Sequence, residues 1–304
     1  MRKIVKGVYN KCCRIGHDEK YLGFFMVLPA VILILIFSIY PVIRSLHMSL
    51  HDIDAMRNHG FVGLQNYIDL INSPRLWGSF GATLIYGIGS IVIQIGLAIS
   101  IAIALNKEFF ARKFVRALIV IPWAIPTAMS AIMWRRFFHP IDGFINASLR
   151  YLGLLQGDFS WFSTPVRAFS VVLFVDAWKF TPLFIMIFLA TLQAIPDHYY
   201  EAAKIQGATS WQMFTMVTLP ILKPTLIVAL IMKTIFVLHS FEQIFILTGG
   251  GPGASTRILS FFAYQETFGY LNYGTGAAIA FIMFIITVII SIFYIRILTK
   301  TDDL

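Results

Sequence analysis

Long apolar runs separated by short polar segments dominate the chain. About 20 consecutive apolar residues are enough to cross a bilayer as a helix, and six runs reach that length. They cover residues 21–43, 80–105, 117–138, 166–192, 226–247 and 274–298. Pro122, Pro126 and Pro182 interrupt the third and fourth runs, but a spanning helix tolerates proline where its neighbours satisfy the freed carbonyl. The pattern predicts an all-α membrane protein with six transmembrane helices.

The composition agrees with this pattern and indicates the domain organisation. Of the 304 residues, 58% are hydrophobic and 13% are charged, whereas about a quarter of a soluble domain is charged. The first run is long and no small-residue cleavage site follows it, so we interpret it as a retained anchor. We expect a basic N-terminal arm at residues 1–20, one membrane domain at residues 21–300 and a tail at residues 301–304.

Lysine and arginine are distributed unevenly among the polar segments. Such residues accumulate in the cytoplasmic loops of membrane proteins. The N-terminal arm holds six, the second loop four, and the fourth loop and the tail two each, against seven in the three other loops together. These counts predict that both termini and the fourth loop lie in the cytoplasm of a cell-membrane protein. The same distribution explains the net charge of +9 through anionic lipid, so no nucleic-acid partner is expected.

The cysteines and the small residues each carry a weaker signal. Cys12 and Cys13 are the two cysteines of the chain, which excludes a disulfide framework and a cysteine-based zinc site. Acylation of this pair remains an alternative, and we expect no metal and no cofactor.

Small residues recur at helical spacing in two runs, at positions Gly96, Ser100 and Ala104, and at Gly274, Gly276, Ala278 and Ala280. They let helices approach closely, either within this chain or against a second subunit.

The polar segment at residues 193–223 separates the fourth and fifth runs. Pro196 suits the first turn of a helix, and Asp197 places a negative charge at the positive end of that helix. The helix should stop at Gly207, which can adopt the left-handed conformation found at helix ends. The segment should therefore begin with one short helix and a sharp bend.

A second short helix should follow this bend. Thr209 and Ser210 can cap its first turn, and we expect Leu219 and Pro220 to end it before the fifth run. The alanines at positions 202 and 203 leave a surface of low relief beside bulkier aromatic residues. Such a pair of helices fits either a groove on a partner protein or the surface of the lipid.

The spacing of residues in this segment resembles that of a known family. Permease subunits of binding-protein-dependent ABC importers carry Glu-Ala-Ala, three residues, Gly, and then an aliphatic residue two positions before Leu-Pro. Here the pattern consists of Glu201, Ala202, Ala203, Gly207, Val217, Leu219 and Pro220. The resemblance implies a type I importer fold in which this loop couples the permease to its ATPase. Glu201 would then pair with a basic group, the alanines would allow close approach, and Gly207 would set the bend.

Further motifs resemble the carbohydrate-uptake branch of the same family, typified by the maltose transporter. They are residues 61–67, Trp178 and Lys179 with Pro182, Phe241 with Glu242, and the Thr-Gly-Gly-Gly-Pro turn at residues 248–252. The resemblance implies one half of a permease heterodimer, two separate ATPase subunits and an extracytoplasmic solute-binding protein that delivers a sugar. No glycine-rich phosphate loop ending in Gly-Lys-Ser/Thr occurs in the chain, so we expect ATP hydrolysis on the partner subunits.

Ionisable residues inside the runs are candidates for the transport path, because each is costly in hydrocarbon and usually faces a cavity or a partner. The candidates are Asp176, Lys179, Lys233, His239 and Glu242. Asp176 and Lys179 are three residues apart and share one helix face. We interpret these two as an ion pair in preference to substrate contacts.

One face of the fifth run mixes polar and aromatic residues at helical spacing. The face consists of Lys233, Phe236, Val237, Ser240 and Gln243. By resemblance to maltose-type permeases, the first four of these positions would contact the sugar, although they could equally pack against a neighbouring helix. The ammonium of Lys233 leaves open an anionic solute such as a glycerol phosphate.

Other functions remain as alternatives with weaker support. An ABC permease for another solute, including a polyamine, would share every motif of the coupling loop. A secondary carrier should contain inverted repeats, and the sequence contains no visible repeat. An intramembrane enzyme should carry a metal-ligand cluster, an activated nucleophile or paired carboxylates, and no such group is apparent. We therefore predict a non-catalytic permease subunit that imports a sugar or sugar derivative.

Overall fold

The computed structural model describes residues 19–55 and 57–302. Residues 1–18 of the predicted arm, with Cys12 and Cys13, and residues 303–304 of the tail lie outside this part. Five described helices are long and apolar enough to cross a membrane: Met26–Ser49, Pro74–Asn106, Pro165–Gln193, Ser210–Leu238 and Tyr273–Ile297. Two shorter helices that are bent relative to each other pass the same test together, and they give a sixth span if the pair is counted as one. The six predicted runs thus correspond to five straight candidates and one broken one.

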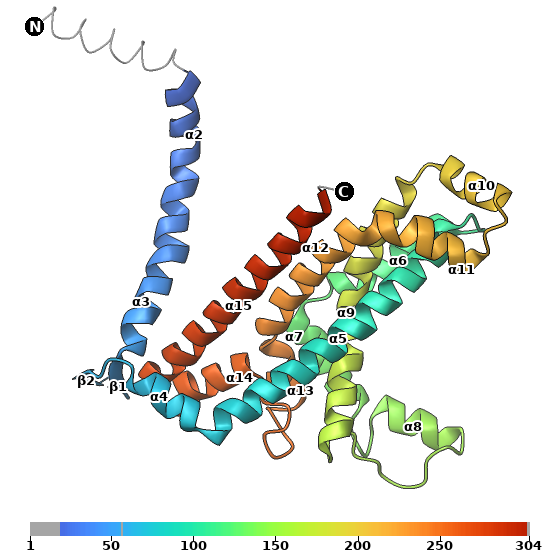
Figure 1. Cartoon of the computed structure of the whole chain (residues 1–304). Coiled ribbons are helices and arrows are strands. Elements are labelled where there is room, and N and C mark those ends of the chain that lie inside the picture. Colours follow the sequence, from blue (N-terminus) through green and yellow to red (C-terminus); the bar gives the residue numbers. More distant parts are fainter. Residues whose placement is uncertain (1–18, 56, 303–304) are drawn as a thin grey trace, which may run out of the picture.

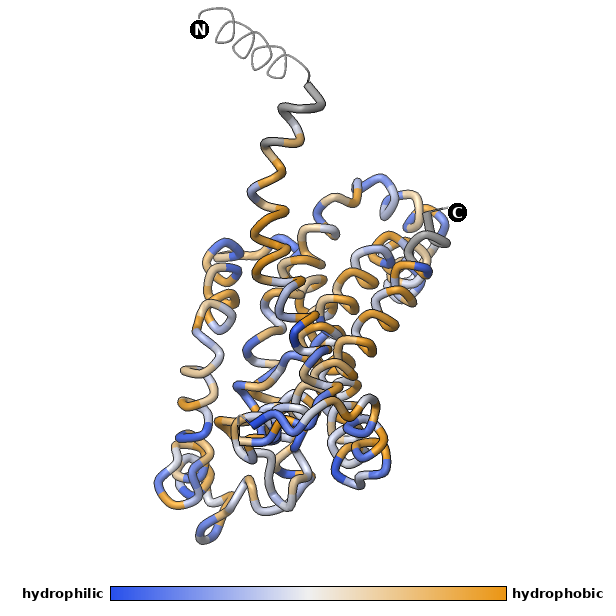
Figure 2. The backbone as a smooth tube through the Cα atoms, turned by 90° about the vertical axis from the view of Figure 1, so that its left-hand side faces the viewer, coloured by the Kyte–Doolittle hydropathy of each residue, from blue (hydrophilic) through white to orange (hydrophobic). Residues whose placement is uncertain are grey.

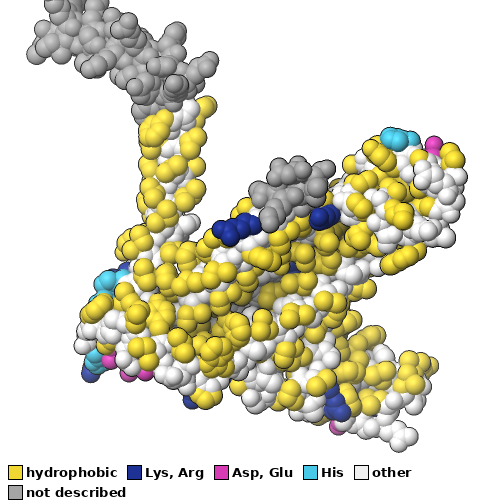
Figure 3. Space-filling view, in the orientation of Figure 1, with side chains coloured by type: hydrophobic (Ala, Val, Ile, Leu, Met, Phe, Trp, Pro, Cys, Tyr) yellow, Lys and Arg dark blue, Asp and Glu magenta, His cyan; other side chains and the backbone are white. Residues whose placement is uncertain are grey.

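The first half of the first span stands apart from the other helices (Figure 1). The whole span consists of α2 (Glu19–Ile34), the π-helix η1 (Leu35–Ile39) and α3 (Tyr40–Ser49). Its apolar stretch covers residues 26–49, whereas the sequence pattern placed it at residues 21–43. Apolar side chains are exposed along its length (Figure 3), and α3 packs against α15 (Tyr273–Asp302).

The end of the molecule below α3 carries a small hairpin that the all-α prediction did not include (Figure 1). Strands β1 (His51–Asp54) and β2 (Arg57–Phe61) pair in antiparallel fashion, and α4 (Gln65–Asn72) follows. The Asn66 side-chain amide donates to the carbonyl oxygens of Ser49 (2.8 Å) and His51 (3.0 Å). This asparagine of the first-loop motif therefore ties α4 to the end of the first span.

The core of the bundle lies between α5 (Pro74–Asn106) and α9 (Pro165–Gln193). Ala98 and Ala102 of α5 are fully buried and belong to the same apolar cluster as Phe184 and Phe188 of α9. Small side chains on one helix thus accommodate aromatic rings on the other. The hydropathy of the chain follows this arrangement, since apolar residues fill the spans and polar residues gather at both ends (Figure 2).

The two sets of small residues have different environments. Gly96, Ser100 and Ala104 are exposed on the outer face of α5. A Cβ at Gly274 would lie 2.3 Å from the His51 carbonyl oxygen, and one at Gly276 would lie 2.0 Å from a threonine oxygen. The glycines of the sixth run therefore pack within the chain, whereas the small residues of the second run lie on an exposed face.

The third run is broken into two helices, whereas the sequence pattern predicted one spanning helix. The helices are α6 (Arg112–Ala124) and α7 (Thr127–Phe137), and they meet at an angle of 94°. Ile125 is extended because the following residue, Pro126, disfavours the helical conformation before it. Pro126 also has no N–H to continue the helical hydrogen bonds.

The fifth run also differs from its predicted limits of 226–247. The helix is continuous from α11 (Ser210–Met213) through the π-helix η2 (Phe214–Thr218) into α12 (Leu219–Leu238). Leu219 and Pro220 do not end the helix, which corrects the prediction. The wider π-helical turn before Pro220 accommodates a proline ring that would otherwise clash with the preceding turn. The helix instead ends at Leu238, and α13 (Glu242–Leu247) follows after a break.

The remaining elements form the connecting segments. The segment between α7 and α9 contains α8 (Phe144–Tyr151), and the loop after α9 contains α10 (Asp197–Ile205). Helix α14 (Leu259–Tyr264) and the π-helix η3 (Gln265–Gly269) precede α15. The start of α2, the α10–α11 loop and the end of α15 lie at one end of the molecule, whereas α4, α8 and the hairpin lie at the other (Figure 1).

Candidate functional site

The loop between α9 and α12 begins with the short helix and the bend that its sequence predicts, whereas the second helix continues into α12. Helix α10 begins directly after Pro196 and carries Asp197 in its first turn. Gly207 has φ of +79°, and its N–H donates to the carbonyl oxygen of Lys204 at 2.9 Å. A Cβ at Gly207 would meet no atom within 4 Å. Glycine is therefore favoured here by backbone conformation and not by crowding.

Helix α11 begins with a capping box. The Thr209 hydroxyl accepts a hydrogen bond from the Gln212 N–H (3.3 Å), and the Gln212 side-chain oxygen accepts one from the Thr209 N–H (2.8 Å). These two bonds satisfy N–H groups that a helix start leaves free. A third contact, 3.1 Å between the hydroxyl oxygens of Tyr200 and Thr218, ties α10 to η2. The loop is thus a defined structure with its own hydrogen bonds.

The loop presents a mixed surface outward. Glu201, Ala202 and Gly207 are exposed. Large apolar side chains are exposed beside them, with 88% exposure for Ile205 and 71% for Trp211. Exposed apolar patches of this kind, rimmed by polar residues, are typical of contact sites for a partner protein. Leu219 and Pro220, which belong to the sequence motif, lie farther along at the start of α12.

A second candidate site lies at the break after α12. A cavity of about 340 Å³ opens there between α7, α9 and the α12–α13 connection, and this size is within the range of small-molecule pockets. Eight residues line the cavity: Thr127, Phe180, Phe236, His239, Ser240, Phe241, Glu242 and Gln243. The lining combines aromatic rings with two hydroxyls, an amide, an imidazole and one carboxylate.

The structure separates the four residues predicted on the fifth run. Phe236 and Ser240 line the cavity. Lys233 and Val237 do not, because the Lys233 side chain is 0% exposed and Val237 is also buried. The helix ends before Ser240, so this residue reaches the cavity from the broken segment and not from a helix face.

The hydrogen bonds of Ser240 determine what it can offer a ligand. Its hydroxyl donates to the Phe236 carbonyl oxygen at 2.9 Å and accepts from the Tyr86 hydroxyl at 3.0 Å. A hydroxyl has one donor and two acceptor positions. Ser240 can therefore accept one further hydrogen bond from a ligand hydroxyl.

The polar residues inside the spans pair differently from the prediction. Asp176 does not pair with Lys179. Its Oδ2 lies 2.7 Å from Nζ of Lys233, 57 residues away, and accepts a hydrogen bond from the Gln94 side-chain amide. Lys179 instead donates to the carbonyl oxygens of Trp123 and Ile125 at the break between α6 and α7. Residues three apart on one helix often pair, but here contacts between helices determine the partners of both residues.

Sequence reasoning missed Tyr86, Gln94 and Phe180 at this site. A polar signal for the first two exists, because α5 carries buried polar residues at spacings of three and four. They are Ser79, Thr83, Tyr86, Ser90 and Gln94. A helix face of this kind inside an otherwise apolar span indicates contact with other polar groups. Phe180 carries no such signal, since phenylalanine is common throughout the chain.

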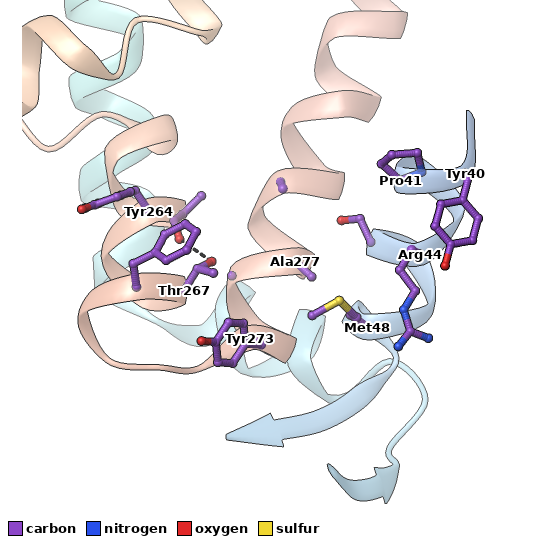
Figure 4. A pocket seen from close by; sticks show the side chains of 13 residues that line it. Tyr40, Pro41, Arg44, Met48, Tyr264, Thr267, Tyr273 and Ala277 are labelled. Atoms are coloured by element: carbon purple, nitrogen blue, oxygen red, sulfur yellow. Dashed lines mark hydrogen bonds between the residues drawn. The ribbon is translucent and has the colours of Figure 1, made fainter. Parts of the chain in front are cut away.

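A larger cavity of about 540 Å³ lies between α3 and the region of α14 and α15 (Figure 4). Its lining combines small residues with three tyrosines and a phenylalanine, and Arg44 is the charged residue among the side chains that line it. Figure 4 shows Arg44 and Met48 reaching from α3, opposite Thr267 and Ala277. This cavity opens beside the first span, and its lining has a guanidinium but none of the carboxylate, carboxamide and imidazole groups of the smaller cavity.

Comparisons with known proteins agree with this geometry. The family described as "Binding-protein-dependent transport system inner membrane component" matches residues 94–301. The "Trehalose/maltose transport system permease protein MalF" of Thermococcus litoralis is 38% identical over 95% of this chain and 97% of its own length. The "Sulfoquinovosyl glycerol transport system permease protein SmoG" of Agrobacterium fabrum is 32% identical over 93% of this chain and 92% of its own.

A solved structure has the same fold. A chain in the crystal structure of a bacterial ABC transporter "involved in the import of the acidic polysaccharide alginate" superposes with a TM-score of 0.81. The identity is 24%, and the match covers 93% of this chain and 96% of that one. At this identity the likeness concerns the fold, which is that of a type I importer permease. The chain is a multi-pass membrane protein and belongs to the family of binding-protein-dependent transport system inner membrane components.

Proposed function

We propose that this chain imports a sugar that an extracytoplasmic binding protein delivers. One observation carries the proposal: the cavity at the helix break combines aromatic rings with hydrogen-bonding groups. The rings of Phe180 and Phe236 lie 5.6 Å apart between centroids, and Ser240 has a free acceptor position beside them. Aromatic faces suit the apolar CH faces of a sugar, and the polar groups suit its hydroxyls.

The charge of the cavity favours a neutral saccharide over an anion or a polyamine. Among the eight lining residues there is no lysine or arginine, and the ammonium of Lys233 is neutralised by Asp176. A polyamine would require several carboxylates, whereas Glu242 is the carboxylate of the lining. The relatives named for trehalose/maltose and for sulfoquinovosyl glycerol support a glycosyl solute.

We also propose that the α10–α11 loop binds a separate ATPase subunit. In this assignment both termini and the loop lie in the cytoplasm, as the distribution of basic residues predicts. Glu201 provides the charged contact with the ATPase subunit. Ala202 and Ala203 allow that subunit to approach closely, and Ile205 and Trp211 provide the apolar surface. A second permease subunit, two ATPase subunits and the binding protein complete the transporter, and the chain itself performs no catalysis.

Reconstitution of the complete transporter tests this function. The permease pair, the ATPase subunits and the binding protein are placed in proteoliposomes with ATP on the ATPase side, and uptake of labelled neutral disaccharides is measured. We expect uptake that requires the binding protein and ATP together. ATP hydrolysis stimulated by a polyamine or a glycerol phosphate but by no sugar would overturn the substrate assignment. Uptake without the ATPase subunits would indicate a secondary carrier instead.

A further inference from the structure

A fully buried ion pair lies behind the wall of the cavity. Asp176 of α9 and Lys233 of α12 both have side chains that are 0% exposed, and their Oδ2 and Nζ atoms are 2.7 Å apart. Gln94 of α5, also fully buried, donates to the same carboxylate oxygen. Each charge alone would be costly in such an environment. The three side chains therefore connect α5, α9 and α12 at one point inside the membrane.

The ion pair is in contact with the cavity wall through aromatic residues. Nζ of Lys233 lies 5.4 Å from the centroid of the Phe180 ring and 5.9 Å from that of Tyr86. An ammonium at this range is attracted to an aromatic ring. Phe180 in turn lies beside Phe236 in the lining. The ammonium thus holds a ring of the wall from behind without lining the cavity.

Tyr86 extends this arrangement to the polar side of the wall. Its side chain is 0% exposed, and its hydroxyl donates to Ser240 at 3.0 Å. Ser240 lies beyond the last helical residue, Leu238, so the regular hydrogen bonds of α12 do not fix its position. Together with the bond that the Ser240 hydroxyl donates to the Phe236 carbonyl oxygen, the bond from Tyr86 fixes this hydroxyl and directs its remaining acceptor position.

We propose that Tyr86, Gln94, Asp176 and Lys233 form a positioning network that sets the shape and hydrogen-bonding pattern of the cavity wall without touching the ligand. The inference rests on the proposed function, since it assigns these residues a role in selecting the transported sugar. It also assigns Lys233 a different role from the direct sugar contact that the sequence suggested. A buried ion pair adds little net stability compared with apolar residues of the same size, so positioning explains its presence better than stability does.

A charge-pair experiment separates positioning from direct contact. Lys233→Met leaves Asp176 buried and unpaired, and Asp176→Asn leaves Lys233 unpaired. We expect each single variant to reduce sugar uptake by about tenfold or more. The double variant Asp176→Asn with Lys233→Met has no unpaired charge and keeps the amide bond to Gln94, so uptake should return to within about threefold of the original. If Lys233 contacts the sugar, the double variant will transport as poorly as Lys233→Met.

A second experiment addresses selectivity, which a merely structural role would not change. Tyr86→Phe removes the hydroxyl that bonds to Ser240 and leaves the ring in place. We expect this variant to change the ratio of uptake rates for two disaccharides that the same binding protein delivers. Ser240→Ala should change the ratio in the same direction, and the double variant should add nothing further. Independent, additive effects of the two changes would overturn the proposed link.

Tyr294→Phe is the matched control for the selectivity experiment. The Tyr294 hydroxyl also contacts another span, at 3.3 Å from Thr234, but it lies outside the cavity lining. We expect its removal to leave the uptake ratio unchanged, and an equal change of ratio in this variant would overturn the proposal. Failure of the proposed function can be distinguished from failure of the proposed network. Absence of sugar uptake by the original transporter contradicts the proposed function, whereas normal uptake without rescue by the double variant contradicts the network alone.

Discussion

Nζ of Lys179, on α9, donates a hydrogen bond of 3.1 Å to the carbonyl oxygen of Trp123, which lies at the break between α6 and α7. The same ammonium donates to the carbonyl oxygen of Ile125. The last carbonyls of a helix have no partner within the helix, and a positive charge at this end is favourable. The lysine thus stabilises a bend of 94° inside a membrane protein.

We predict that Lys179→Met destabilises the protein by about 2–3 kcal/mol, since two charge-assisted hydrogen bonds are lost from carbonyls that have no water to replace them. Thermal unfolding in detergent measures the effect as a lower Tm. Lys223→Met is the control, because Lys223 is exposed on α12 and its removal should leave the Tm unchanged. Equal Tm values for the two variants would contradict this role of Lys179.

At Gly207 we predict that Val and Asn have different effects. The residue has φ of +79°, a conformation that asparagine adopts more readily than β-branched residues. Gly207→Val should therefore lower sugar-stimulated ATP hydrolysis far more than Gly207→Asn. Since a Cβ meets no neighbour in this chain, equal loss with both residues would indicate instead that a partner protein packs tightly against this position.

Glu201 should matter for assembly but not for the stability of the chain. It is exposed, and exposed substitutions usually change stability by less than about 0.5 kcal/mol. We predict that Glu201→Lys keeps the original Tm and loses co-purification of the ATPase subunits. Glu108→Lys makes the same charge change at an exposed residue of another loop and should retain the ATPase. Retention by both variants would contradict the coupling role of Glu201.

Asn146 should hold the segment between α7 and α9 in place. It is fully buried, donates to the carbonyl oxygens of Pro140 and Phe159 at 2.7 Å each, and accepts from the Trp161 ring N–H at 2.7 Å. Asn146→Ala leaves these groups without partners, which costs about 1–3 kcal/mol for each buried group. We predict faster cleavage of residues 139–164 by protease in intact proteoliposomes. Ala147→Ser, at an exposed neighbour, should cleave at the original rate.

The α10–α11 loop could be predicted from sequence because its signals are local. Proline, aspartate, glycine and threonine each act on the residues next to them, and the observed α10, the bend at Gly207 and the cap at Thr209 follow from those preferences. The presence of the spans could be predicted for a similar reason, since a run of about 20 apolar residues is enough to indicate a spanning helix.

The ends of the spans and the partners of buried charges could not be predicted in the same way. Asp176 has a lysine three residues away on its own helix, yet it binds Lys233 of another helix. The break after Leu238 follows no proline or glycine, so it depends on packing between helices. At Pro126 the signal for a break was present, but a proline alone does not distinguish a kink from a bend of 94°.

The helix that begins at Ser210 and ends at Leu238 has 29 residues, which gives a rod of about 43 Å at about 1.5 Å per residue. One end of this rod lies in the α10–α11 loop, and the other end lies beside Ser240. A tilt of about 5° about its middle would move each end by about 2 Å in opposite directions, as the same length requires. The helix can therefore act as a lever, in which a small displacement imposed on the loop shifts the cavity wall by more than half the length of a hydrogen bond.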